Sequence, residues 1–419
     1  MKRNFFLILF LAAAAIARAN SIFIPMDEKQ ANHLKAYGIA YWILHSEMEV
    51  DWLLNYRGGS FMCDYHPAIQ NELVIRGVTF EIISAAQTNQ IIAEISSPSA
   101  NYDIMKLEKY PKIAVYSPKS KLPWDDAVTL VLTYAEIPYD IIFDDEVMNG
   151  VLPKYDWLHL HHEDFTGQYG KFYVQYNNMP WYIEQQKEAE DLARKHNFHK
   201  VSQLKLAVAK KIKEFVTGGG FMFAMCSATD TYDIALAAEG VDICSREYDG
   251  DPSDPKAQEK LHYENTLAFT DFKLVMDPLQ YEFSDIDNQV NERGLRQDND
   301  YFTLFEFSAK WDPIPTMLTQ NHTRVVKGFY GQTTGFKSHL IKPDVLVMGE
   351  NKQIKETKYV HGILGKGFWT YYGGHDPEDY QHQVGEEPTD LNQHPNSPGY
   401  RLILNNVLFP AAKKKKQKT

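Results

Sequence analysis

Cys226 is the residue of this chain best placed to act as a nucleophile. It stands between a wholly apolar segment, Phe221–Met225, and a segment of helical spacing that begins near Thr229. The residues on either side of it are small, so we expect a strand that ends in a tight turn at this cysteine. A thiol at such a turn lies near the N–H groups of a helix N-terminus, which lower its pKa and can bind an oxyanion. The alternatives are a buried structural thiol or a disulfide with Cys63 or Cys244.

A histidine that can serve as the base follows the last apolar segment, 367–372. Two glycines permit a turn there, and His375, Asp376 and Glu378 come next. Because parallel strands end at the same edge of a sheet, we expect His375 to lie close to Cys226. Asp376 or Glu378 would then orient the imidazole. A set of cysteine, histidine and carboxylate is typical of nucleophilic acyl transfer, in which the histidine takes the thiol proton.

A cluster of histidines and acids follows another short apolar segment, 157–160. His159 and His161 alternate and are expected to share one face of a strand, whereas His162 is expected to point away. Histidines and carboxylates bind polar substrates, and they also bind divalent metals such as Zn²⁺. No cofactor is required, but His161, His162 and Glu163 are a candidate metal site; the alternative is a set of buried structural histidines. The residues predicted here to contact substrate are His161, His162, Glu163 and Asp164.

Trp124 and Asp125 add to the same edge, since they follow a β-type run at 112–116. Ligands of open α/β sheets bind where the strands end at their carboxyl termini. Four separate loops would therefore bring polar residues to one edge of the sheet. This pattern predicts a site for a small-molecule or glycan substrate.

The segments that carry these residues alternate between strand and helix patterns. The clearest helix has apolar residues at intervals of three, and thus one buried face. Alternation of this kind predicts an α/β fold with a three-layer, mostly parallel sheet that is covered by helices on both faces. The predicted strands lie at 112–116, 139–143, 157–160, 221–225 and 367–372, and the predicted helices at 125–136, 202–215, 229–238 and 400–408.

Two other regions differ from this alternating pattern. Apolar and β-branched runs at 39–44, 50–54 and 73–83 predict a small β-rich unit before the α/β region. Residues 245–350 are rich in Asp, Asn, Pro and aromatic residues, and we expect a long insertion whose loops lie over the carboxyl edge of the sheet. The predicted parts are residues 1–19, 20–108, 109–412 with its insertion at about 245–350, and a basic tail at 413–419.

The N-terminus has the order of features found in a secretory signal peptide. Lys2 and Arg3 precede an apolar run at 5–16, and Ala17-Arg18-Ala19 forms a small-x-small cleavage site. The run is shorter than the roughly 20 residues that span a bilayer, so we expect cleavage and an exported, periplasmic protein with no membrane span. The net charge of −12 argues against nucleic acid as a partner.

The motifs around Cys226 and His375 resemble those of the class I glutamine amidotransferase-like fold. In that fold a cysteine at a strand–helix turn and a late His-x-Glu form a triad, which implies roles for Cys226, His375 and Glu378 within a flavodoxin-like sheet. The run at 365–379 resembles the trehalose-utilisation (ThuA-like) branch of the same fold. Through the motifs at 157–172 and 405–412, nearly all of residues 20–419 is similar to exported Bacteroidetes proteins labelled asparagine synthetase B.

Together these features predict an exported hydrolase that acts on an amide or glycan-linked substrate by Cys–His–acid chemistry. An ATP-dependent asparagine synthetase is not predicted, because Lys2 stands where such enzymes have a nucleophilic cysteine and no Ser-Gly-Gly-x-Asp-Ser loop is present. The alternative is a non-catalytic carbohydrate-binding or envelope interaction protein. Such a protein would use the same aromatic cleft to hold a sugar.

Overall fold

The computed structural model describes residues 20–413, with the exception of residues 121 and 289. The predicted signal peptide therefore lies outside the described residues, as does most of the predicted basic tail. Among the described residues, no helix combines the length and the apolar character needed to cross a membrane.

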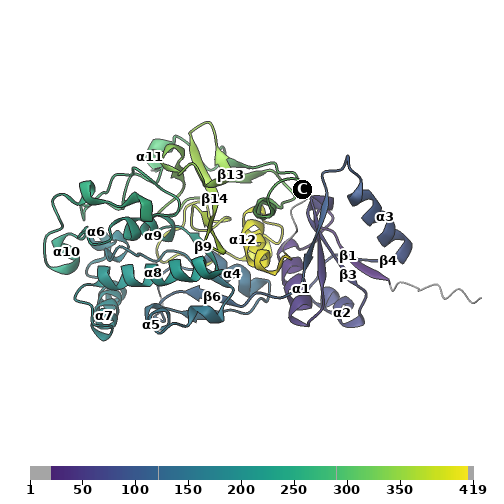
Figure 1. Cartoon of the computed structure of the whole chain (residues 1–419), viewed down its shortest axis with the longest axis horizontal. Helices are drawn as coiled ribbons and strands as arrows, with labels where there is room; N and C mark the ends of the chain where they lie inside the picture. The colour runs from purple at the N-terminus through teal and green to yellow at the C-terminus, as the bar shows by residue number, and fades with distance from the viewer. Residues whose placement is uncertain (1–19, 121, 289, 414–419) are drawn as a thin grey trace, which may run out of the picture.

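The chain begins with a separate antiparallel sheet of five strands in the order β4-β1-β3-β2-β5, seen at the right of Figure 1. The run at 39–44, predicted as β-type, lies instead within helix α1 (His33–His45). This helix is buried on nearly all sides, against both its own sheet and helix α12 (Pro398–Leu408), so its apolar residues show no helical periodicity. The other elements are β1 (Ser21–Ile24), β2 (Val50–Leu54), β3 (Ser60–Asp64), α2 (Pro67–Ile75), β4 (Glu81–Ile83), α3 (Ala85–Ser96) and β5 (Asp103–Leu107).

The main sheet is mixed, and the prediction of a three-layer, mostly parallel, flavodoxin-like sheet is wrong. Five strands are parallel and run in the order β15-β9-β8-β6-β7, but the sheet continues beyond β15 as an antiparallel half, β11-β10-β13-β14, with β12 also paired to β14. The parallel strands are β6 (Ile113–Tyr116), β7 (Asp140–Ile142), β8 (Trp157–Leu160), β9 (Phe221–Met225) and β15 (Gly367–Tyr372). The antiparallel strands are β10 (Tyr301–Leu304), β11 (Val325–Lys327), β12 (Phe336–Lys337), β13 (Leu346–Asn351) and β14 (Glu356–Leu364).

The segment at 245–350 explains this difference. We expected it to contribute mainly loops, but it supplies β10, β11, β12 and most of β13 to the sheet. Several of these strands have only two to four residues, which is too short for an alternating pattern to stand out from the surrounding polar sequence. A tight turn at Gly365, where φ is +61°, then joins β14 to β15 as an antiparallel hairpin.

Alternate residues of the parallel strands β6, β8, β9 and β15 enter two different cores. In β6, Ile113 and Val115 pack with helices α1, α4 (Ala127–Tyr134) and α12. Ala114 and Tyr116 point to the opposite face, where helices α8 (Val201–Gly218) and α9 (Ala228–Ala237) pack against the sheet. This two-sided burial accounts for the continuous apolar character of the strands. The remaining helices are α5 (Asp144–Met148), α6 (Tyr173–Tyr176), α7 (Pro180–Lys195), α8 (Val201–Gly218), α9 (Ala228–Ala237), α10 (Arg246–Asp249) and α11 (Val290–Arg293).

Candidate functional site

Cys226 forms a strained turn between β9 and α9. Its φ is +50°, in the left-handed region that residues other than glycine rarely adopt. Its N–H donates to the carbonyl of Gly374 at 3.2 Å, and the N–H of Ala228 donates to the carbonyl of His161 at 2.8 Å. These two bonds tie the turn to the segments that follow β15 and β8. Strain held in place by neighbouring strands in this way is common at functional sites.

The parallel register brings the three segments to one edge of the sheet. Met225, the last residue of β9, pairs with Tyr372, the last residue of β15, while Ala224 pairs with the last residue of β8. The residues that follow each strand therefore emerge side by side. His375 is held further by its own N–H, which donates to the carbonyl of Tyr330 at 2.8 Å.

The thiol of Cys226 and the imidazole of His375 interact in the interior. Burial alone would raise the pKa of the thiol, but the interaction with His375 and the charge of His161 lower the pKa of Cys226 to about 6. Burial disfavours the charged form of His375, but interactions with Asp125 and Cys226 outweigh this and raise the pKa of His375 to about 10. The pair therefore favours a thiolate beside an imidazolium, which is the reactive form of a catalytic cysteine.

Asp125 is the carboxylate that lies beside this histidine. Its Oδ1 is 3.7 Å from Nε2 of His375, an ion-pair distance. Burial raises the pKa of Asp125, but its interactions with His375 and His382 outweigh burial and lower it. The sequence placed Asp125 among the substrate-contacting residues, whereas the structure places it where an orienting carboxylate would stand.

The two carboxylates predicted to orient His375 have other partners. Asp376 is fully buried, and its Oδ1 accepts the N–H of Glu378 at 2.8 Å. Glu378 forms an ion pair with His394, with 3.1 Å between Oε2 and Nδ1. The chain turns sharply at this point, so closeness in sequence to His375 does not become contact with its ring.

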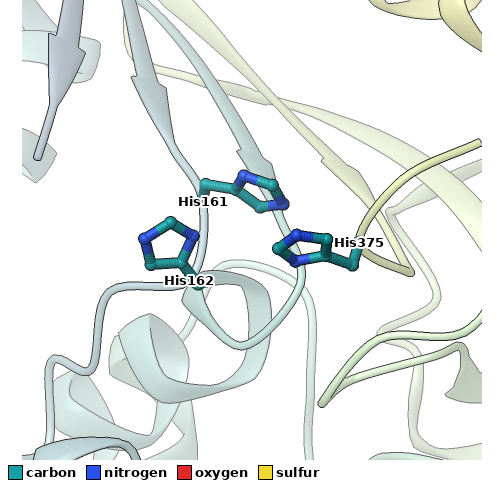
Figure 2. Close-up of side chains that lie close together, drawn as sticks. All are labelled: His161, His162 and His375. Carbon is teal, nitrogen blue, oxygen red and sulfur yellow. The ribbon is translucent and has the colours of Figure 1, made fainter. Parts of the chain in front are cut away.

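Three imidazoles converge next to the thiol (Figure 2). The ring centroids of His161 and His375 are 4.5 Å apart, and those of His161 and His162 are 4.9 Å apart. The expectation that His162 points away from its neighbour is wrong, because β8 ends at Leu160 and the alternation of side chains ends with it. The ring of His162 therefore turns toward the same space as that of His161.

A second layer of residues surrounds these rings. Oδ2 of Asp126 lies 3.2 Å from His159 and 3.3 Å from His161, and Oδ1 of the same carboxylate caps helix α4. Burial raises the pKa of Asp126, but the two histidines more than offset this and hold it well below its usual range. On the other side, the ring of His382 stacks on that of His375 at 4.2 Å and reaches Asp125 at 3.3 Å. His382 could not be recognised from the sequence, because it lies in a loop with no pattern of its own.

Glu163 and Asp164, also predicted to contact substrate, are buried for different reasons. Asp164 accepts hydrogen bonds from the N–H groups of Thr166, Gln168 and Gly170, so it organises the loop after β8. Glu163 lies with its Oε1 3.9 Å from Nε2 of His162, and burial raises the pKa of Glu163 to about 8. Neither residue lines the cavity described next.

A cavity of about 190 Å³ opens onto Cys226. Its wall includes the aromatic rings of Trp124, Phe172, Tyr281 and Tyr330. The last two come from the segment at 245–350, which thus contributes to the wall of the cavity. The polar side of the cavity is formed by Cys226, His162, His375, His382, Gln332 and Gln381. Trp124, which the sequence predicts to contact substrate, lies in the wall of this cavity.

Many buried polar atoms around the cavity have no hydrogen-bond partner. Buried polar groups in native proteins are nearly always paired, so a local excess of unpaired atoms indicates a place for a ligand or an ion. The atoms concerned are Nε1 of Trp124, Nε2 of His161, both ring nitrogens of His162, Oγ of Ser227 and Nε2 of His375.

The other two cysteines do not line this cavity. All three thiols of the chain are free, so the alternative of a disulfide at Cys226 is not found. Cys244 donates to the carbonyl of Thr166 at 3.3 Å. Cys63 lines a separate cavity of about 630 Å³ at one end of the N-terminal sheet.

Comparisons with known proteins add little to this description. No protein-family profile matches the chain, and no curated protein matches it. Among solved structures, the chain is similar to the cytoplasmic proteins STM3548 and STM1381 of Salmonella typhimurium, each at 12% identity over 72% of this chain and 100% of theirs, with TM-scores of 0.34 and 0.35. Gan42B, a GH42 beta-galactosidase, is 12% identical over 64% of this chain and 28% of its own, with a TM-score of 0.29. TM-scores this low carry no argument about fold or activity.

Proposed function

We propose that this protein is a cysteine-dependent hydrolase that cleaves an amide or glycan-linked amide substrate. The observation that carries the proposal is the contact of Cys226, on a strained strand–helix turn, with the imidazole of His375, which has the carboxylate of Asp125 behind it. Nucleophile, base and orienting acid thus follow three different parallel strands. The exported, periplasmic location stays a prediction from residues 1–19.

The residues account for both halves of the reaction. His375 holds the proton of Cys226, and the thiolate attacks the carbonyl carbon of the substrate to form a C–S bond. The C–N bond then breaks, and His375 gives its proton to the departing amine. Water next attacks the thioester while His375 takes one of its protons. Release of the carboxylic acid returns the proton to the thiol–imidazole pair, and Asp125 holds the imidazole in place throughout.

The cavity supports a substrate with a flat or ring-shaped part. Trp124, Phe172, Tyr281 and Tyr330 offer aromatic faces, which suit sugars and other ring systems. Gln332 and Gln381 add amide groups that can donate to and accept from hydroxyls. An amide attached to a sugar would place its ring against the aromatic wall and its carbonyl near Cys226.

The same aromatic wall favours the second candidate, a carbohydrate-binding protein without catalysis. The two functions differ in what they require of the thiol. A binding protein needs the rings of Trp124 and Phe172 but has no use for a thiolate at Cys226.

Turnover of a panel of aryl amides and glycosyl amides by the wild type and by Cys226→Ala tests the proposal. We expect hydrolysis by the wild type only, and a covalent thioester on Cys226 in mass spectra of rapidly quenched reactions. Sugar binding with no turnover, or turnover of every amide that survives Cys226→Ala, would contradict it. Cys63→Ala is the matched control, since it removes a buried thiol far from the cavity.

A further inference from the structure

We infer that His161, His162 and His375 form a site for one divalent transition-metal ion, and that an ion bound there inhibits Cys226 by occupying its base. The inhibitory part rests on the proposed function, while the metal site stands on the geometry of the three imidazoles alone. The sequence pointed to Glu163 as the third ligand. The structure assigns that place to His375.

The distances fit a small ion. One ligand nitrogen from each of His161, His162 and His375 lies within 4.8 Å of the other two. In a tetrahedral zinc site with Zn–N bonds of about 2.0 Å, the nitrogens are about 3.3 Å apart. A modest inward rotation of the three rings, which Figure 2 shows close together, would therefore complete the site.

The unpaired atoms are a second and independent sign. Nε2 of His161 and both ring nitrogens of His162 are buried without a hydrogen-bond partner, and so is Nε2 of His375, which is 3.7 Å from the nearest carboxylate oxygen. His161 and His375 are 1% and 5% exposed, which leaves little water to satisfy them. Coordination would engage one nitrogen of each ring. Nitrogen ligands alone favour Zn²⁺, Ni²⁺ or Cu²⁺ over Mg²⁺ and Ca²⁺, which prefer oxygen.

Two carboxylates next to the three imidazoles would orient one ring and add negative charge near a bound ion. Oδ2 of Asp126 lies 3.3 Å from Nδ1 of His161, which leaves Nε2 of that ring free to face an ion. Metal-binding histidines are commonly oriented by a carboxylate in this way. Asp125, next to His375, places a second negative charge near the added cation. Two anionic groups thus offset the charge of a divalent ion, which must displace the proton of His375 in order to bind that ring.

A neighbouring group of possible ligands is a poorer site. Asp126, His159 and His161 also lie close together. However, both nitrogens of His159 are already engaged, with the carbonyl of Phe223 and with Asp126, each at 3.2 Å. The three-imidazole group therefore offers the freer ligand atoms.

His375 cannot bind a metal ion and serve as the base for Cys226 at the same time. A nitrogen lone pair that coordinates a metal no longer accepts the proton of Cys226, and the ring turns toward the ion. We therefore expect zinc to remove the contact with His375 that keeps Cys226 as a thiolate, and so to slow the reactions of this thiol. The effect should be reversed by a chelator.

Titration calorimetry of the chelator-treated full chain with zinc chloride tests the site. We expect one ion per chain for the wild type and for Cys226→Ser, at least tenfold weaker binding for His162→Gln, and no binding of magnesium chloride at the same concentrations. His262→Gln, which changes an exposed histidine, is the matched control and should bind as the wild type does. Failure of the wild type to bind zinc, or equal binding by His162→Gln, would overturn the site.

The rate at which iodoacetamide alkylates Cys226, followed by peptide mass spectrometry, tests the inhibition. We expect zinc to slow alkylation at least tenfold in the wild type, and to have no such effect in His162→Gln. Alkylation that is indifferent to bound zinc would overturn the inhibitory role. If zinc binds as expected but Cys226 never reacts even without metal, the proposed hydrolase fails while the metal site is upheld.

Discussion

Cys63 and Cys226 are both buried near the end of a strand, yet their surroundings give them opposite chemistry. Burial and the charges of Asp64 and Asp51 raise the pKa of Cys63 to about 12. Cys226 is equally buried, but the imidazole of His375 lowers its pKa to about 6. Burial raises the pKa of both thiols, and at Cys226 the neighbouring imidazole reverses that effect.

The topology of the two sheets explains why reactive side chains gather around Cys226, at the end of β9, and not around Cys63, at the end of β3. In the antiparallel N-terminal sheet, the end of β3 lies beside the start of β1, so that Asp64 pairs with Ser21. In the parallel half of the main sheet, β8, β9 and β15 all end at one edge. Three loops converge there, and each delivers a polar side chain to the same space.

Replacement of the two cysteines should give the largest contrast. Cys226→Ala should reduce amide turnover by at least about 10³-fold, because the nucleophile is lost. Cys63→Ala should leave turnover within about twofold. Steady-state kinetics on the most reactive amide of the panel measures both. Equal losses of amide turnover in the two variants would show that Cys226 is no more important for activity than Cys63.

Removal of the imidazole should make Cys226 resemble Cys63. In chelator-treated His375→Gln, the pKa of Cys226 should rise from about 6 to the range of a buried thiol, above about 9. The thiolate fraction at pH 7, and with it the alkylation rate, should then fall about a hundredfold. For the wild type the rate should rise with pH through about 6 and level off above pH 7. A variant with an unchanged pH profile would exclude His375 as the cause.

The carboxylate behind His375 should have an intermediate effect. Asp125→Asn removes the charge 3.7 Å from the imidazole, and we expect turnover to fall about tenfold or more. Glu378→Gln, which affects only the pair with His394, should change turnover less than about threefold. Measurement of kcat and KM for both variants separates a loss of orientation from a loss of binding. A larger loss of turnover in Glu378→Gln than in Asp125→Asn would instead identify Glu378 as the carboxylate that orients His375.

The smallest effect should come from the acids beside Cys63. Asp51→Asn and Asp64→Asn remove charges that raise the pKa of this thiol, but burial is the larger cause. Alkylation of Cys63 at pH 7 should therefore change less than about threefold in either variant. A large gain in reactivity would mean that charge, rather than burial, keeps Cys63 inert.

The sequence predicted the parallel half of the sheet much better than the antiparallel half. Strands 157–160, 221–225 and 367–372 coincide with β8, β9 and β15, because buried parallel strands are continuous apolar runs bounded by polar loops. The strands at 301–304 and 325–327 left no comparable signal. They are short, and their residues alternate between exposed and buried positions within polar sequence.

The sequence predicted only those site residues that come directly after a recognisable strand. Cys226, His375 and His161 were found because each comes directly after an apolar run. The partner of His375 could not be chosen, since Asp125 lies 250 residues earlier in the chain, whereas Asp376 is its neighbour. Only the three-dimensional turn at Gly374, where φ is +94°, decides which carboxylate meets the ring.

A competition experiment tests the central claim most directly. Chelator-treated native protein is exposed to a limiting amount of iodoacetamide at pH 7, and alkylation of Cys63, Cys226 and Cys244 is measured site by site by mass spectrometry. Our account predicts that Cys226 reacts at least about a hundredfold faster than the other two, in line with its lowered pKa. Equal labelling of the three sites, or preferential labelling of Cys63, would contradict it.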